Sequence, residues 1–240
     1  MVVRENTIEA FTEALRMGAD GVECDVRRSA DGALVVHHDP DVPGLGPIFA
    51  HRAADLPAYI PRLAAAIEAC GDRLVNVELK ELPGQPGYDP AYPMARMVVQ
   101  VVVERGWQDR IILSSFDLLA LDAALDAAKE AAEQAGEEAG EEAGEAAGEA
   151  AAAPLRTGWL TPSLFDQAGA LRTVIERGHR ALHPQHESVT EALVSAAHQA
   201  GISVNTWTVD DPERIRQLDR MGVDAIITNV PDLARAALAP

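Results

Sequence analysis

The fold is decided by the stretch Gly18-Ala19-Asp20-Gly21-Val22-Glu23-Cys24-Asp25-Val26. Its alternating side chains predict a strand with Glu23 and Asp25 on one face and the apolar residues on the other. Two carboxylates that point the same way repel each other, so such a face either holds a cation or opens to water. For an isolated E-x-D pattern, a water-facing strand edge is the more common outcome.

Two further motifs extend this acidic face. The apolar run Leu34-Val35-Val36, a strand or an extended loop, ends at His37, His38 and Asp39. The run Leu74 to Lys80 alternates again, with Asn76, Glu78 and Lys80 on one face. Glu78 therefore adds a third carboxylate on a second strand. A metal site becomes a more specific interpretation of Glu23 and Asp25 than a water-facing strand edge.

Short apolar strands alternate with helical segments along the chain. This order predicts a parallel sheet with helices outside it, and the number of repeats favours a closed (β/α) barrel. Active sites of such barrels lie at the carboxyl ends of the strands. The polar and aromatic residues expected there are Glu23, Asp25, His38, Glu78, Lys80, Ser115, His183 and Trp207.

Composition limits the possible partners. The chain has 240 residues, 48% of them hydrophobic, which suits one domain over residues 1–240. A formal net charge of -18 argues against nucleic acid or an anionic membrane as a partner. Cys24 and Cys70 lie in apolar runs and are expected to be buried thiols. No apolar run reaches the length of a membrane span and no leader is evident, so we expect a soluble, cytoplasmic protein; the sequence carries no signal of oligomeric state.

Residues 127–153 differ from the rest of the chain. They consist almost entirely of Ala, Glu and Gly, and their eight glutamates and one lysine supply -7 of the charge. Repeated glycines and like charges four residues apart both disfavour a stable helix. We expect a frayed helical extension or a disordered insert, without a function of its own.

Several spaced motifs together resemble the glycerophosphodiester phosphodiesterase family. The resemblance covers the chain except for the insert. The segments that carry it are Glu5-Asn6-Thr7, Gly18-Ala19-Asp20, Glu23-Cys24-Asp25, His38-Asp39, Val77-Glu78-Leu79-Lys80, Ser114-Ser115-Phe116, Trp207-Thr208-Val209 and Gly222 to Asn229.

The resemblance implies a fold, a reaction and a set of site residues. It implies a TIM-type (β/α)8 barrel that hydrolyses glycerophosphodiesters to sn-glycerol 3-phosphate and an alcohol. Glu23, Asp25 and Glu78 would hold a divalent cation, Mg²⁺ or Ca²⁺, which both prefer oxygen ligands. His38 would be one of two histidines that act as acid and base.

Three more residues are implied to touch the substrate, each with an alternative. Lys80 would meet a phosphate oxygen, or else pair with Glu78 or Glu23. Trp207 would form the wall of a pocket, or else pack in the core. Ser115 would bind substrate or a carboxylate that supports the metal ligands, or else cap the helix that follows it.

The chain departs from the family pattern at its start. The family's first strand and its His-Arg pair would precede Glu5 by several residues. We therefore expect a barrel that lacks its first strand, and we attribute this to a start codon assigned too far downstream. In the alternative the protein truly begins at Met1 and is inactive. It would then be a degenerate barrel that binds a phosphate ligand or a partner without turnover. A related phospholipase-type diesterase is a further alternative.

Overall fold

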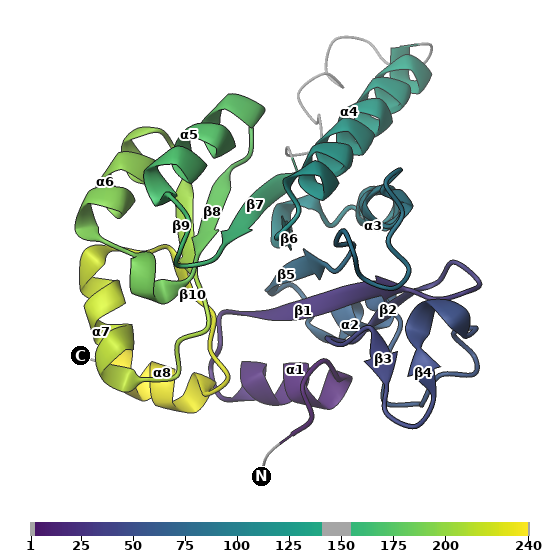
Figure 1. Ribbon diagram of the computed structural model, residues 1–240, viewed down its shortest axis with the longest axis horizontal. Coiled ribbons are helices and arrows are strands. Elements are labelled where there is room, and N and C mark those ends of the chain that lie inside the picture. The colour runs from purple at the N-terminus through teal and green to yellow at the C-terminus, as the bar shows by residue number, and fades with distance from the viewer. Residues whose placement is uncertain (1–2, 141–154, 240) are drawn as a thin grey trace.

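The computed structural model describes residues 3–140 and 155–239 (Figure 1). Parallel strands and helices follow one another along the chain. The strands are β1 (Gly21–Arg28), β2 (Leu34–Val36), β3 (Asp41–Val42), β4 (Gly46–Pro47), β5 (Leu74–Leu79), β6 (Ile111–Ser115), β7 (Arg156–Thr161), β8 (Ala181–Pro184), β9 (Ser203–Thr206) and β10 (Ala225–Ile226). The helices are α1 (Ile8–Arg16), α2 (Leu63–Ala69), α3 (Pro93–Glu104), α4 (Leu118–Gly140), α5 (Gln167–Arg177), α6 (Glu191–Gln199), α7 (Pro212–Met221) and α8 (Pro231–Leu238). Short 3₁₀ turns lie at Ile48–Ala50, Gln108–Arg110 and His186–Ser188.

The main sheet has eight strands in the order β10-β9-β8-β7-β6-β5-β1-β2. Only β2 runs antiparallel to its neighbour among these described strands. The sheet curls, and the helices lie outside the curve (Figure 1). Parallel pairing brings the carboxyl ends of the strands to one edge, so residues far apart in sequence meet there.

The curled sheet does not close within the described part of the chain. β10 pairs with β9, and β1 pairs with β5 and β2, but no described strand joins β10 to β1. The predicted fold class, an α/β TIM-type barrel that lacks one strand, is confirmed.

Local signals explain where the first helix begins. Thr7 is its N-cap, and its Oγ1 accepts a hydrogen bond from the N–H of Ala10 at 3.2 Å. This bond satisfies one of the backbone donors that a helix start leaves free. The helix buries Phe11 against the core, as its apolar spacing predicts.

The stretch between Pro40 and Pro61, whose prolines and glycines are typical of a loop, contains short regular elements. It contains the hairpin of β3 and β4, whose turn includes Gly44 at φ +79°. Val42 and Ile48, at 2% and 1% exposure, pack in a small apolar cluster under this segment. Glycine serves here in the turn of a short hairpin, and the rest of the segment, apart from the 3₁₀ turn at Ile48–Ala50, is a loop.

Helix α4 extends into residues 127–153, in agreement with the helical extension, one of the two expectations for this segment. It continues from Leu118 to Gly140, through the first half of the low-complexity segment, and projects away from the barrel (Figure 1). The helix propensity of Ala and Glu outweighs the cost of Gly136 here. Residues 141–154 lie outside the described part of the chain. The expectation of one domain over 1–240, with 127–153 as an insert, stays a prediction.

Both cysteines are free and buried, as expected. Cys24 is 1% and Cys70 is 3% exposed. Burial raises the pKa of both thiols. Of the helices described, none is both long and apolar enough to span a bilayer.

Candidate active site

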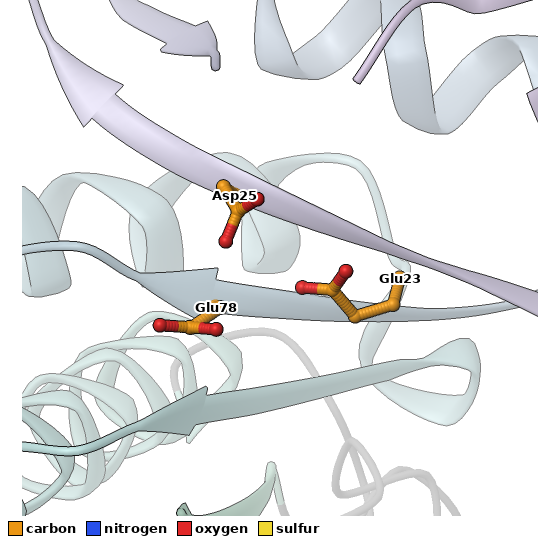
Figure 2. A group of neighbouring side chains, drawn as sticks. All are labelled: Glu23, Asp25 and Glu78. Carbon is orange, nitrogen blue, oxygen red and sulfur yellow. The ribbon is translucent and has the colours of Figure 1, made fainter. Parts of the chain in front are cut away.

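Three carboxylates meet at the carboxyl edge of the sheet. Glu23 and Asp25 come from β1 and Glu78 from β5, and each offers an oxygen within 4.8 Å of the others. The register explains the meeting, because Asp25 lies opposite Glu78 in the parallel pair. Figure 2 shows the three side chains turned toward one common space.

The environment of this cluster opposes its negative charge. Burial raises the pKa of Glu23 well above its ordinary value, and the neighbouring charges of Asp25 and Glu78 raise it further. Burial also raises the pKa of Glu78 to about 7; Lys80 opposes this rise and Asp25 adds to it. A buried group of like charges is stable only when a cation or protons compensate it.

The donor set fits a divalent cation. Oε1 of Glu23 is buried without a hydrogen-bond partner, whereas Oε1 of Glu78 has the ammonium of Lys80 beside it. Buried polar atoms are normally satisfied, so the oxygen of Glu23 requires a ligand. Carboxylate oxygens at this spacing suit Mg²⁺ or Ca²⁺. Glu23, Asp25 and Glu78 are the residues that would hold such an ion.

Lys80 already partly neutralises the cluster. Its Nζ lies 2.6 Å from Oε1 of Glu78 and 3.0 Å from Oδ1 of Asp25, and its side chain is only 8% exposed. The contact with Glu78 is an ion pair without hydrogen-bond alignment. Burial lowers the pKa of Lys80, but the two carboxylates outweigh this effect and raise it. The ion-pair alternative considered for Lys80 is therefore present, with Glu78 and Asp25 as partners.

Asn6 fixes the orientation of Asp25. Its Nδ2 donates to Asp25 Oδ2 at 2.8 Å, and its Oδ1 accepts from the Asp25 N–H at 2.9 Å. Asn6 has a left-handed backbone, with φ 57°, which asparagine tolerates better than most residues. Sequence reasoning used Asn6 only as part of a family motif and did not assign it to the site.

His38 follows β2 near the carboxylates. Its side chain is 54% exposed, and its Nδ1 lies 2.9 Å from Oδ1 of Asp39. The N–H of the preceding His37 donates to the backbone carbonyl of Asp25, which brings this part of the chain beside the cluster. The neighbouring His37 turns its Nδ1 to the carbonyl of Asp39 at 3.0 Å.

Arg27 is a site residue that sequence reasoning missed. It is 6% exposed, and both Nε and Nη2 donate to the carbonyl oxygen of His38. Its Nη1 also donates to Oε1 of Gln85, in the loop after β5, at 3.3 Å. Strand alternation puts Arg27 on the same face as Glu23 and Asp25, and this signal could have identified it.

The other two predicted substrate residues lie at the ends of β6 and β9. Trp207 is partly buried, donates from Nε1 to the carbonyl of His183 at 2.7 Å and packs edge-on against Phe116 at 5.3 Å. Ser115 is fully buried, and its Oγ donates to the carbonyl of Leu79 and accepts from the N–H of Asp117. Its hydroxyl holds strand ends together, and direct contact between Ser115 and substrate stays a prediction.

His183 lies inside the barrel. It is 1% exposed, its Nε2 contacts Nδ2 of Asn205 at 2.9 Å, and burial lowers its pKa to about 3. A Cβ on Gly158 would lie 2.3 Å from that same Nε2. His183 is therefore a neutral residue packed in the interior, rather than one exposed at a strand end.

The motifs and geometry agree with the comparison to known families. A model of the Glycerophosphoryl diester phosphodiesterase family matches residues 2–233. The chain belongs to this family. Membership confirms the predicted enzyme class, a phosphoric diester hydrolase.

Relatives of this family resemble the chain over most of its length. A curated "Glycerophosphodiester phosphodiesterase" from Caldanaerobacter subterraneus is 29% identical, over 96% of this chain and 90% of its own length. The crystal structure of a glycerophosphodiester phosphodiesterase from Thermotoga maritima has 25% identity and a TM-score of 0.71, covering 98% of this chain and 92% of its own. An Oleispira antarctica phosphodiesterase, solved with the product sn-glycerol-3-phosphate, has 23% identity and a TM-score of 0.76, covering 99% and 92%, and shows the shared fold.

Proposed function

We propose that this chain hydrolyses glycerophosphodiesters to sn-glycerol 3-phosphate and an alcohol, and that the reaction depends on a divalent cation, Mg²⁺ or Ca²⁺. The observation that carries the proposal is the convergence of Glu23, Asp25 and Glu78 within 4.8 Å. The family match over residues 2–233 supports the substrate class. The proposed partner is a small molecule, and the expectations of a cytoplasmic location and of no nucleic-acid partner remain part of the proposal.

Each residue of the site has a task in this proposal. A cation held by the three carboxylates would neutralise the phosphate oxygens and polarise the phosphoryl group. Lys80 supplies a second positive charge for a non-bridging oxygen. Trp207 forms a wall against the carbon atoms of the substrate. Ser115 acts through the strand end that it holds.

His38 serves as the proton donor. Its Nδ1 pairs with Asp39, which leaves Nε2 as the atom that exchanges a proton with the substrate. As a water oxygen bonds to phosphorus and loses its proton to solvent, the bond between phosphorus and the alcohol oxygen breaks, and Nε2 gives its proton to the leaving alkoxide. Protonation of a poor leaving group by a positioned side chain is worth about 10²–10⁴-fold in rate.

The test uses glycerophosphocholine as substrate. We expect release of glycerol 3-phosphate and choline in the presence of Mg²⁺ or Ca²⁺, and loss of turnover in EDTA. Glu78→Gln and His38→Ala should each abolish most of this activity. Glu176→Gln, at an exposed position on α5, is the matched control and should retain it.

Three outcomes would count against the proposal. Unchanged turnover in EDTA would overturn the role of the metal. Release of a phosphorylated alcohol and free glycerol would overturn the product assignment. Calorimetric binding of the cation without any hydrolysis would favour a barrel that binds and does not turn over.

A further inference from the structure

Strand β1 holds the chain around His38 by two kinds of contact. The first is made by its backbone and the second by a side chain. The N–H of His37 donates to the backbone carbonyl of Asp25 at 2.9 Å, which is an ordinary contact between adjacent strands. Strand β2 ends at Val36, so this contact is already beyond the regular pairing. At the next residue, the carbonyl of His38 is held by the side chain of Arg27.

The imidazole of His38 has little other support. Its side chain is 54% exposed, and its hydrogen-bond contact is with Asp39, the adjacent residue, which is itself 68% exposed. An exposed side chain that is not packed takes its direction mainly from its own backbone. The backbone at His38 therefore sets the point and the direction from which its imidazole reaches the site.

We propose that Arg27 is a positioning residue for His38, which it serves by clamping the His38 carbonyl with two N–H donors. The proposal rests on the proposed function, in which His38 protonates the leaving alkoxide. A guanidinium presents its donors in a rigid fork, whereas the single ammonium of lysine cannot make the same paired contact. The clamp therefore needs arginine and not merely a positive charge.

The surroundings of Arg27 show that it is anchored well enough for this task. Its side chain lies in the sheet face that also carries Glu23 and Asp25, and it is 6% exposed. Its third contact, to Gln85 at 3.3 Å, ties the clamp to the loop that follows β5. One buried side chain thus links β1, the chain around His38 and the segment after Glu78.

The neighbouring Arg28 provides a matched control. It lies on the same strand with its side chain on the opposite face, it is 34% exposed, and its ion pair with Asp89 is loose at 3.9 Å. Arg27→Lys and Arg28→Lys therefore keep the same net charge and change one residue each in the same strand. Only the first removes the paired contact with the His38 carbonyl.

The kinetic test measures kcat and KM with glycerophosphocholine. For Arg27→Lys we expect kcat to fall tenfold or more with KM within twofold, because a small misplacement of a catalytic group costs rate rather than binding. Arg28→Lys should keep both constants within twofold. A wild-type kcat in Arg27→Lys would overturn the proposal.

A double-mutant cycle separates positioning from general damage. The cycle uses glycerophosphocholine, whose alkoxide leaving group needs the proton donor, and the residual turnover that His38→Ala retains serves as the reference. In the His38→Ala background we expect Arg27→Lys to cost less than twofold, because the residue it acts through is gone. An equal loss in both backgrounds would show that Arg27 acts independently of His38 and would overturn the proposal.

A second readout does not depend on turnover. The imidazole resonances of His38, followed by NMR through a pH titration, report its tautomer and its pairing with Asp39. We expect them to shift in Arg27→Lys and to stay unchanged in Arg28→Lys. Unchanged His38 resonances in Arg27→Lys would overturn the positioning role, whether or not the protein hydrolyses the substrate. Failure of the wild type to hydrolyse glycerophosphodiesters would instead overturn the proposed function.

Discussion

The ammonium of Lys80 lies 2.6 Å from Oε1 of Glu78, and both side chains are nearly buried, at 8% and 11% exposure. The same nitrogen lies 3.0 Å from Asp25. Lys80 thus contributes positive charge to a cluster whose carboxylates repel one another. Removing one partner of a buried pair leaves an uncompensated charge and typically costs 3–5 kcal/mol.

Lys80→Met should therefore lower the free energy of unfolding by about 3–5 kcal/mol in EDTA. With saturating Mg²⁺ or Ca²⁺ the deficit should shrink, because the ion compensates the carboxylates that Lys80 has left. Urea unfolding with and without the ion measures both effects. Lys129→Met is the control, since Lys129 is 70% exposed on α4. Equal stability of the Lys80 and Lys129 variants in EDTA would contradict the prediction.

Asn6→Gly should destabilise the fold by about 1–3 kcal/mol. Glycine accepts the left-handed backbone at this position, so the loss reports the two hydrogen bonds with Asp25 rather than strain. Asn6→Asp keeps the side-chain shape but turns a carboxylate toward Asp25, and its deficit should grow as the pH rises. Chemical denaturation of both variants at pH 5 and pH 8 measures these losses of stability. If the deficit of Asn6→Asp did not change with pH, repulsion between the two carboxylates would not be its cause.

Gly158→Ala should be strongly destabilising, because its Cβ would lie 2.3 Å from Nε2 of His183. Overpacking of a barrel interior commonly costs about 1–3 kcal/mol. Adding His183→Ala should recover part of the loss by removing the obstructing ring. Gly136→Ala on α4 is the counterpart, since nothing lies within 4 Å of its new methyl group, and it should stabilise the helix by up to about 1 kcal/mol.

Glu81 should make stability depend on pH. This residue follows β5, is 4% exposed, and accepts a hydrogen bond from the N–H of Ala95 in α3. Burial raises its pKa from 4.5 to about 7, although the backbone N–H groups of Ala95 and Met94 lower it. The folded state binds the proton more tightly than the unfolded state, so this contribution is fully present below about pH 4.5 and is lost as the pH rises through about 7. Glu81→Gln cannot titrate.

The variant should match the wild type near pH 5 and exceed it by about 1–3 kcal/mol at pH 8. Chemical denaturation at the two pH values measures the difference. Glu133→Gln, exposed on α4, should show no such change. A Glu81→Gln protein no more stable than the wild type at pH 8 would rule out the assigned protonation.

The meeting of Glu23, Asp25 and Glu78 could be predicted from the sequence because strand period and parallel pairing fix which residues share a face. The family resemblance supplied the fold and the enzyme class. The clamp of Arg27 on His38 could not be predicted, because it joins a side chain to a backbone carbonyl eleven residues away, and its geometry depends on how β2 leaves the sheet. The alternation of side chains along a strand predicts the face on which Arg27 lies, but not the group that it contacts.

The same limit applies to Asn6 and Glu81. Asn6 reaches Asp25 from the loop before α1, nineteen residues away. Glu81 lies beneath the N-terminus of α3, fourteen residues from Ala95. In both cases the sequence shows a polar residue outside regular structure, and only the packed arrangement of neighbouring elements decides which donor it meets.

Three of the four consecutive residues 78–81, at the end of β5 and just after it, each have a separate role. Glu78 belongs to the carboxylate cluster, Lys80 neutralises it, and Glu81 accepts from the start of α3. Inserting or deleting a single residue between Glu78 and Glu81 would move the side chains that follow it to other faces. This segment therefore tolerates substitution but not a change of length, whereas the loop that begins at Leu82 lies outside these three tasks. Among natural variants of the chain, length differences should be found after Glu81 and never between Glu78 and Glu81.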